Sequence, residues 1–441
     1  MNFQPNTPCP ACGKIHQSRV EQVLSGKGVL QKLPEILKER GLQKPFLLSD
    51  PNTLKAAGLT VEKLLEKAEI PFAKCTLSAE KPEPDEHAMG EVILHFDPSC
   101  DCVIAIGSGV VGDLSKLLAS TAKIPLITVA TAPSMDGFAS ETSSMARRGV
   151  KVSLPSRCAS VIIGDTDILK NAPMKMLRSG LGDMLAKYIS ICEWRIGALV
   201  TGEYYCEAIA QLVRDALKKC VDNADCLLAR DEEAVEAVFK GLVLGGMAMS
   251  YAGVSRPASG VEHYISHVWE MRALERGEPS DLHGMQCAVG TLIAARLYAR
   301  LLKATPDREK ALKHAEGYSM DEHNSALREF LGSSAEPMIE LEKKEKKYDP
   351  ALHEKRLEII LSHWDQILAI VKEEVPAAEE LEALYQKIGL PMTPAEVGVE
   401  NALSETTFRF TGDIRDKYVL SRLLWDLGLT EIPQTILEDM R

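Results

Sequence analysis

The sequence has little of what a nucleic-acid-binding or membrane-spanning protein needs. Acidic residues outnumber basic ones by 63 to 51, and the formal net charge is −12. Nucleic acid is therefore not a predicted partner, because a basic surface would be needed to offset phosphate repulsion. No run of apolar residues approaches the length of about eighteen that a spanning helix requires, so membrane insertion is not predicted. A small anionic substrate stays compatible with this charge, since its binding depends on the local potential.

The chain also lacks a disulfide framework and a recognisable secretory signal. Its 11 cysteines are odd in number and scattered, and the first residues show no basic stretch followed by an apolar one. Reduced thiols in the cytoplasm are the simplest interpretation. Cys9-Pro10-Ala11-Cys12-Gly13-Lys14, with His16 nearby, has the form of a zinc knuckle. No second CxxC follows, so a tethered or flexible N-terminal stretch is favoured over a metal site.

Two kinds of pattern divide the 441 residues. Up to about residue 170, helical spacing alternates with short apolar runs, as in a parallel, doubly wound sheet. The expected strands are residues 45–50, 71–77, 102–107, 125–131 and 160–164. Beyond them only helical patterns occur. We therefore predict an α/β plus all-α protein, with a nucleotide-binding domain over residues 1–170 and a helical domain over residues 171–441.

A glycine-rich turn follows the most apolar of these strands. Gly107-Ser108-Gly109-Val110-Val111-Gly112-Asp113 stands between that strand and a predicted helix. Glycine lets a backbone approach a pyrophosphate, and the helix N-terminus offers free N–H groups, so a phosphate cradle is favoured over a plain tight turn. No acidic residue ends the next strand, where the ribose partner is usually found. A dinucleotide would therefore bind by a different scheme.

The next strand ends in a loop that is rich in hydroxyl groups. Thr128-Val129-Ala130-Thr131-Ala132-Pro133-Ser134-Met135-Asp136-Gly137 places Thr, Ser and Asp side chains at the carboxyl end of a parallel strand, which faces the ligand crevice. These groups could hydrogen-bond a nicotinamide or a polyol. Ordinary turn chemistry explains the same residues equally well.

Three of the 10 histidines lie close together in the helical part of the chain. His263 and His267 share one face of a predicted helix, and His283 begins the next helix. Imidazole is a common metal ligand, and a catalytic metal site takes three protein ligands and keeps one position open. Asp183, in Gly180-Leu181-Gly182-Asp183, is expected to open a helix. It either caps that helix or supplies a carboxylate ligand.

These motifs, taken in their order along the chain, resemble the sn-glycerol-1-phosphate dehydrogenases. The closest resemblance is to the bacterial AraM-like type within the dehydroquinate synthase and iron-containing alcohol dehydrogenase superfamily. It is carried by GSGVVGD, TAPSMDGFAS, GLGDMLAK, SGVEHYISH and the LHG that begins at Leu282. The late segments 412–418 and 423–428 also resemble this group. The matches extend from the first domain almost to the C-terminus.

The resemblance implies a Rossmann-like N-terminal domain, a helical C-terminal domain and an active site in the cleft between them. It implies a metal bound by Asp183, His263 and His283. It further implies that His267 and Asp183 act in catalysis and that Asp136, Asp183 and His267 contact substrate. The residues implied to contact the nucleotide are Gly109, Val110, Val111, Gly112, Asp113, Thr131, Ala132, Pro133, Ser134 and Ser140.

The implied reaction is reduction of dihydroxyacetone phosphate to sn-glycerol 1-phosphate by NADH or NADPH, in phospholipid metabolism. One divalent metal is implied, with nickel suggested by the bacterial group and zinc or iron also compatible, in a homodimer. Arg256 and Lys187 are positional candidates for binding the phosphate. A glycerol or polyol dehydrogenase on the same scaffold, or a non-catalytic nicotinamide-binding regulator, is the alternative. Ligation by His267 in place of His263 also stays open.

Overall fold

The computed structural model describes residues 5–147 and 150–438, and its backbone forms two compact units. Unit 1 comprises Met1–Met184 and Gln211–Val254, and unit 2 comprises Leu185–Ala210 and Ser255–Arg441. The sequence predicts one boundary at residue 170, whereas the units are discontinuous in the chain. The long helix α11 (Glu232–Ala252) packs with the sheet of unit 1, contacting η3 (Gly137–Ala139) and strand β1.

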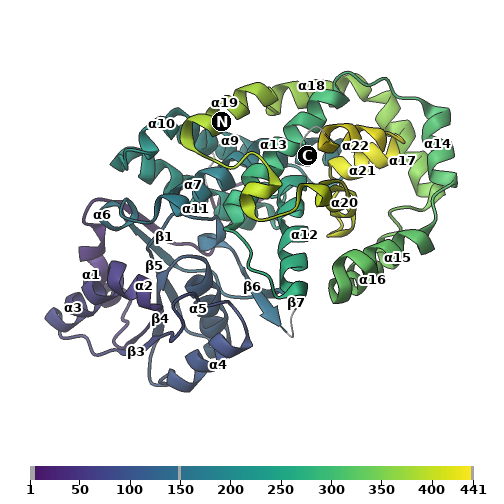
Figure 1. Cartoon of the computed structure of the whole chain (residues 1–441). Helices are drawn as coiled ribbons and strands as arrows, with labels where there is room; N and C mark the ends of the chain where they lie inside the picture. Colours follow the sequence, from purple (N-terminus) through teal and green to yellow (C-terminus); the bar gives the residue numbers. More distant parts are fainter. Residues whose placement is uncertain (1–4, 148–149, 439–441) are drawn as a thin grey trace. The chain divides into compact units, whose positions relative to one another are not determined.

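Unit 1 is built on the predicted parallel sheet (Figure 1). Its six strands are all parallel and follow the order β1-β8-β5-β4-β2-β3. The strands are β1 (Gln22–Gly26), β2 (Pro45–Ser49), β3 (Ala73–Thr76), β4 (Cys102–Gly107), β5 (Leu126–Ala130) and β8 (Val161–Asp165). Five of them lie where the sequence predicts a strand. The edge strand β1 has no continuous apolar run and is only partly buried, so its sequence gives no strand signal.

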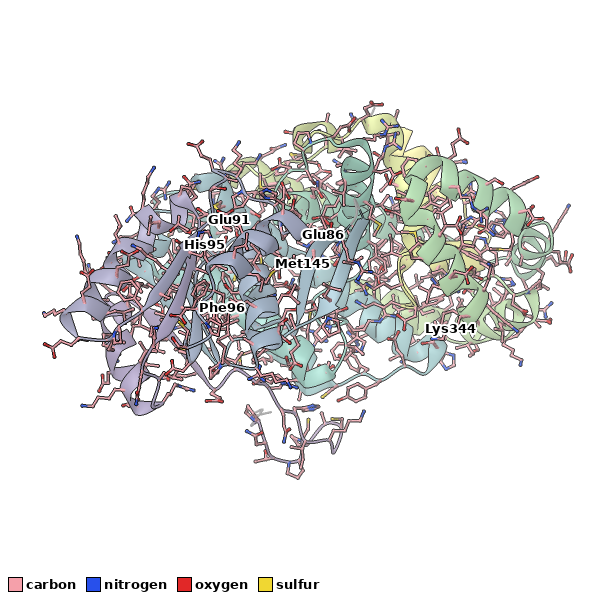
Figure 2. The ribbon with its side chains drawn as sticks, turned by 90° about the horizontal axis from the view of Figure 1, so that it is seen from below. Glu86, Glu91, His95, Phe96, Met145 and Lys344 are labelled. Atoms are coloured by element: carbon pink, nitrogen blue, oxygen red, sulfur yellow. The ribbon has the colours of Figure 1, made fainter. Side chains whose placement is uncertain are left out.

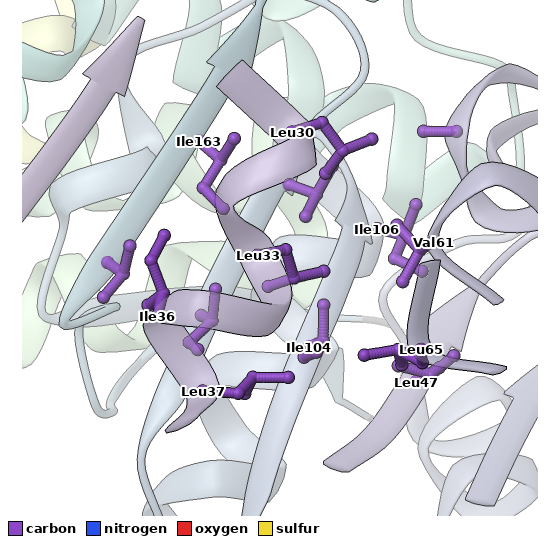
Figure 3. Packing of buried hydrophobic residues seen from close by; sticks show 14 of the residues in the cluster. Leu30, Leu33, Ile36, Leu37, Leu47, Val61, Leu65, Ile104, Ile106 and Ile163 are labelled. Carbon is purple, nitrogen blue, oxygen red and sulfur yellow. The ribbon is translucent and has the colours of Figure 1, made fainter. Parts of the chain in front are cut away.

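One face of the sheet is covered by helices whose apolar residues follow helical spacing. Leu33, Ile36 and Leu37 lie on one side of α1 and pack against Ile104 and Ile163 of the strands (Figure 3).

The helical segments of unit 1 are η1 (Val29–Lys32), α1 (Leu33–Glu39), α2 (Pro51–Thr53), η2 (Leu54–Gly58), α3 (Leu59–Lys67), α4 (Glu86–His95), α5 (Gly109–Ala122), η3, α6 (Thr166–Leu169), α7 (Met174–Leu185), most of α9 (Glu207–Asp222), α10 (Ala224–Leu227) and α11.

Two features of unit 1 are not predicted from the sequence. Strands β6 (Thr142–Arg147) and β7 (Val150–Pro155) form an antiparallel ribbon outside the main sheet. Helix α4 precedes β4, and Glu86, Glu91 and His95 follow one another along it (Figure 2). An isolated bridge between Asp85 and Ala146 joins the start of α4 to β6. β6 and β7 pair as consecutive segments of the chain, whereas the bridge from Asp85 to Ala146 joins segments that lie far apart in the sequence and that local periodicity does not reveal.

Unit 2 consists of helices. They are α8 (Lys187–Thr201), α12 (Val261–Arg276), α13 (His283–Leu301), α14 (Arg308–Glu316), α15 (Met320–Leu331), η4 (Gly332–Ser334), α16 (Ala335–Glu345), α17 (Pro350–Ser362), α18 (Trp364–Glu374), α19 (Ala378–Ile388), η5 (Pro394–Val397), η6 (Asn401–Leu403), α20 (Ser404–Phe410), η7 (Thr411–Asp413), α21 (Leu420–Asp426) and α22 (Glu431–Glu438). Across the described part of the chain, no helix has both the length and the apolarity needed to cross a membrane.

Candidate active site

The glycine-rich turn joins β4 to α5 and leaves open space beside two of its glycines. A Cβ placed on Gly109 or Gly112 would meet no other atom within 4 Å, whereas one on Gly107 would lie 2.6 Å from Cβ of Val111. Gly107 is therefore required for the close approach of helix and strand. Gly112 donates its N–H to the carbonyl of Ser108, the N-cap of α5, at 2.8 Å. Two glycines in the first turn of this long helix thus face open space, which is compatible with a phosphate cradle at its N-terminus.

The strand order identifies a second residue at this edge of the sheet. The chain runs from β2 outward to β3 and from β4 in the opposite direction to β5, so β2 and β4 flank the topological switch point. Ligands of open α/β sheets bind at the carboxyl ends of such strands. Asp50 directly follows β2, where its carboxylate accepts the N–H groups of Asn52 and Thr53. An acidic residue, absent after β5, thus follows β2 at the switch point, a position that only the strand order reveals.

The loop after β5 is held by two helices of unit 1. Ser179 of α7 donates its hydroxyl to the carbonyl of Ser134 at 2.8 Å. A Cβ on Gly180 would lie 1.9 Å from the carbonyl oxygen of Pro133, and one on Gly246 of α11 would lie 2.8 Å from the carbonyl oxygen of Asp136. Glycines in α7 and α11 therefore let both helices approach the loop backbone. Thr131, Ala132 and Ser134 are buried in this loop.

Asp183 lies in the last turn of α7, and the prediction that it opens a helix is wrong. The helix begins at Met174, just after Pro173, and continues through both glycines to Leu185. Asp183 therefore does not cap a helix start. Its fully buried carboxylate accepts the backbone N–H of Asp136 at 2.9 Å through Oδ2. The bond ties the predicted ligand to the loop that carries the predicted substrate residue.

Two other residues implied to contact the nucleotide have clear structural roles. Asp113 pairs with Lys116 one turn later on α5, at 2.7 Å, and Lys116 donates to the carbonyl of Thr142 at 2.7 Å. The hydroxyl of Ser140 accepts the N–H of Thr142 at 3.1 Å. These bonds fix the start of the β6–β7 ribbon to α5. Contact with a nucleotide stays a prediction for both residues.

In unit 2, helices α12 and α13 bring the three histidines together. The ring centroids of His263 and His283 lie 5.1 Å apart, those of His267 and His283 5.5 Å, and those of His263 and His267 6.4 Å. The helices approach closely at Gly290, where a Cβ would lie 2.6 Å from the carbonyl oxygen of Glu262. The concentration of histidines predicted from the sequence is therefore also a cluster in space.

Carboxylates orient these imidazoles. Nδ1 of His263 lies 2.8 Å from Oε1 of the buried Glu262, and donation to this carboxylate leaves the lone pair of Nε2 for a metal. Glu270 contacts Nδ1 of both His267, at 3.1 Å, and His283, at 3.2 Å. Neither glutamate is singled out in the sequence, because a carboxylate beside a histidine is common on helix surfaces.

Cys287 is a further candidate ligand that sequence reasoning missed. Its Sγ lies 3.5 Å from Nε2 of His283, one turn earlier on α13. Burial raises the pKa of this thiol, but His263 and His283 outweigh burial and lower it overall. Burial lowers the pKa of His283, and Cys287 with Glu270 raises it to about 10. The i, i+4 spacing of His283 and Cys287 is the signal that could have found this thiol.

Within unit 2 the potential ligand atoms form two alternative groups. One contains His263, His283 and Cys287, and the other contains His267, Glu270 and His283, with ligand atoms within 4.8 Å of one another in each. His283 belongs to both. The His263 side chain is 5% exposed and that of His267 is 23% exposed. Both histidines have a carboxylate at Nδ1, so it is the deeper burial that favours His263 as the ligand.

The two cationic candidates for phosphate binding are engaged within unit 2. The buried Arg256 pairs with Glu203 through two nitrogens and donates to the carbonyl of Tyr418 at 2.9 Å. The buried Lys187 donates to the carbonyl of Ala258 at 3.1 Å. Both side chains therefore stabilise the helical unit. These contacts do not mark either residue as the group that binds the substrate phosphate.

Comparison with known proteins agrees with this architecture. Residues 24–173 match the family model described as iron-containing alcohol dehydrogenase. The glycerol-1-phosphate dehydrogenase [NAD(P)+] of Bacillus subtilis (strain 168) is 31% identical over 329 residues, covering 72% of this chain and 83% of that protein. The same-named protein of Halalkalibacterium halodurans is 27% identical over 413 residues, covering 93% of each chain.

Among solved structures, glycerol dehydrogenase from Schizosaccharomyces pombe has the same fold. The two structures superpose with a TM-score of 0.59 at 17% sequence identity, and the match covers 97% of this chain and 92% of that one. At this identity the likeness concerns the fold alone. The 31% identity to the Bacillus subtilis protein, over most of that protein's length, is high enough to assign the chain to a family. The chain belongs to the glycerol-1-phosphate dehydrogenase [NAD(P)+] family.

Proposed function

We propose that this protein catalyses the reversible, NAD(P)H-linked reduction of dihydroxyacetone phosphate to sn-glycerol 1-phosphate with the help of one divalent metal. The observation that carries the proposal is the cluster of His263, His267 and His283 in a chain of this family. A glycine-rich cradle at the switch point of a parallel sheet supports the nucleotide part of the proposal.

The donor atoms fit a divalent transition metal. We propose Asp183, His263 and His283 as its protein ligands, with Cys287 as a fourth donor. Imidazole and thiolate suit zinc or nickel, and the carboxylate suits several divalent ions. When bound, the metal would act as a Lewis acid on the ketone oxygen. Glu262 and Glu270 would orient the imidazoles by accepting their Nδ1 protons.

The remaining residues bind, orient and transfer a proton. NADH or NADPH supplies the hydride, and Gly109 to Asp113 with Thr131 to Ser134 and Ser140 would hold it. Asp136 would bind the substrate hydroxyl groups, in a loop fixed by Ser179 and Asp183. His267, with Nδ1 against Glu270, would donate a proton from Nε2 to the developing alkoxide oxygen. Fixing these groups in place is itself a large part of the rate enhancement.

Three finer points belong to the proposal. Nickel is our first expectation for the metal, by resemblance to the bacterial group, and the thiol of Cys287 makes zinc a close second. Use of both NADH and NADPH is expected. A homodimer is expected from the family. A location in the cytoplasm is expected from the many free thiols.

The decisive experiment is an NADH-oxidation assay with dihydroxyacetone phosphate, followed by determination of product stereochemistry. Metal-stripped protein should be inactive and should recover with Ni²⁺ or Zn²⁺. An enzyme that oxidises only sn-glycerol 3-phosphate should not oxidise the product. Oxidation of the product by that enzyme would contradict the stereochemical part.

The same assay separates the rival functions. Faster turnover of unphosphorylated glycerol than of sn-glycerol 1-phosphate would show a polyol dehydrogenase. Nucleotide binding without turnover in metal-replete protein would show a regulator. We expect preference for the phosphorylated substrate.

A further inference from the structure

The N-terminal CPACGK segment forms an ordered turn in unit 1. Cys9 donates its N–H to the carbonyl of Lys14 at 2.9 Å, and Gly13 donates to the carbonyl of Cys9 at 2.7 Å. Gly13 has a φ of 72°, in the left-handed region that favours glycine. An antiparallel bridge joins Pro8 to Ile15 just outside the turn. The described part of this segment is therefore a closed knuckle, which agrees with the tethered form of the N-terminal stretch that the sequence favours and not with the flexible one.

The knuckle brings three potential metal ligands to one point. Ligand atoms of Cys9, Cys12 and His16 lie within 4.8 Å of one another. Sγ of Cys12 is 3.3 Å from Nε2 of His16. In a tetrahedral zinc site with the usual bond lengths, a sulfur and a nitrogen ligand lie about 3.6 Å apart. The observed spacing is thus close to that of a loaded site.

His16 is oriented as a metal ligand is. Its side chain is buried, and Nδ1 lies 2.9 Å from the carbonyl oxygen of Tyr251. Donation to this carbonyl places the proton on Nδ1 and leaves the lone pair of Nε2 toward the sulfur of Cys12. A histidine that donates its far nitrogen to a backbone carbonyl is the usual arrangement at metal sites. Tyr251 lies in the last turn of α11, so the arrangement also fixes the knuckle to that helix.

We propose that Cys9, Cys12 and His16 bind a structural zinc ion. Two thiolates and an imidazole are the ligands that zinc prefers, and a knuckle of this form needs no large core to hold them. The fourth position is taken by a further thiolate or by water. The ion would fix the N-terminal segment to the end of α11. This site is separate from the proposed catalytic metal and does not depend on the proposed reaction.

The first test is metal content, measured by elemental analysis of the full-length protein purified without chelator. We expect about two metal equivalents per chain, of which one is zinc at the knuckle. The double substitution Cys9→Ser with Cys12→Ser should remove about one equivalent and leave NADH-linked turnover within about twofold. Cys226→Ser, at an exposed thiol, is the matched control and should retain both. An unchanged metal content in the double variant would refute the site.

The second test does not depend on the folding of the cysteine double variant. Co²⁺ replaces zinc in the wild-type protein, and thiolate-to-cobalt absorption reports sulfur ligands. In His263→Ala, where the histidine cluster with Cys287 no longer contributes, its intensity should match two thiolates if water completes the site and three if a further cysteine does. The band should persist in His263→Ala, which disrupts the other metal site, and a band that vanishes there would assign the thiolates to the histidine cluster. A Cys9–Cys12 disulfide in protein purified under reducing conditions would also overturn the proposal.

Discussion

The carboxylate of Asp183 accepts the backbone N–H of Asp136 at 2.9 Å, which ties the end of α7 to the loop after β5. Asp183 is thus both a proposed metal ligand and a structural support of the proposed substrate loop. The two roles of Asp183 can be separated, because one substitution removes only the charge and another also removes the hydrogen bond.

Asp183→Asn keeps an acceptor oxygen and removes the charge. We expect it to lower turnover by at least about 100-fold and to lose the catalytic metal, because a neutral amide is a poor metal ligand. Asp183→Ala should also lose the bond to Asp136 and be less stable than Asp183→Asn by about 1 kcal/mol. Denaturant unfolding of the metal-free variants measures this difference. Equal stabilities would show that the bond contributes nothing.

Gly180→Ala should destabilise unit 1, because its Cβ would lie 1.9 Å from the carbonyl oxygen of Pro133. The loop or α7 must shift, at a cost of about 3 kcal/mol. Gly90→Ala is the matched control: Gly90 is an exposed glycine within α4, and an added Cβ would meet no atom within 4 Å. That substitution should stabilise the protein by about 0.5–1 kcal/mol. Thermal unfolding of both variants would test the contrast.

Glu262→Gln should weaken metal binding by about 10- to 100-fold, because the carboxylate that accepts the Nδ1 proton of His263 becomes neutral. Competition with a chelator of known affinity measures the change. Glu373→Gln is the same substitution at an exposed ion pair with Arg195 and should leave metal affinity unaltered. Equal metal affinity in both variants would mean that His263 is not a ligand, which would favour His267.

Asp50→Asn should raise the preference for NADPH over NADH by about tenfold, since a carboxylate at the switch point repels the 2′-phosphate. Asparagine is as good an N-cap as aspartate, so α2 should be unaffected. Asp85, the N-cap of α4, offers a control of the same kind. The measurement is the ratio of kcat/KM for the two nucleotides. No change in this ratio would place Asp50 outside the nucleotide site.

Glu193 should make the stability of unit 2 depend on pH. It accepts the N–H groups of Val261 and Leu420, and burial and then the nearby Glu262 raise its pKa to about 8. A carboxyl whose pKa is raised on folding contributes stability that is present below its unfolded pKa, near 4.5, and is lost as pH rises through about 8.

The advantage of the wild type over Glu193→Gln should therefore shrink as the pH rises from about 5 to about 8. Denaturant unfolding at a series of pH values, on metal-free protein, measures it. A constant difference between the two proteins would show that Glu193 ionises normally.

Local patterns in the sequence determined the sheet and the histidine cluster. Five apolar runs predict five of the six parallel strands, because strands buried on both faces must be apolar throughout. His263 and His267 share a helix face through their spacing alone. The turn at Gly107 to Asp113 is recognised by its glycines, of which Gly107 allows the close approach of helix and strand.

Only the tertiary structure placed the residues that support these motifs. The strand order places Asp50 at the switch point of the sheet. The packing of α12 against α13 places Glu262, Glu270 and Cys287 around the imidazoles. Asp183 lies in the last turn of α7, because the helix continues through Gly180, where it packs tightly against the loop after β5. His16 meets Tyr251 across more than two hundred residues, a contact that no local pattern encodes. Periodicity reports burial within one element, whereas contacts between elements depend on how their surfaces fit.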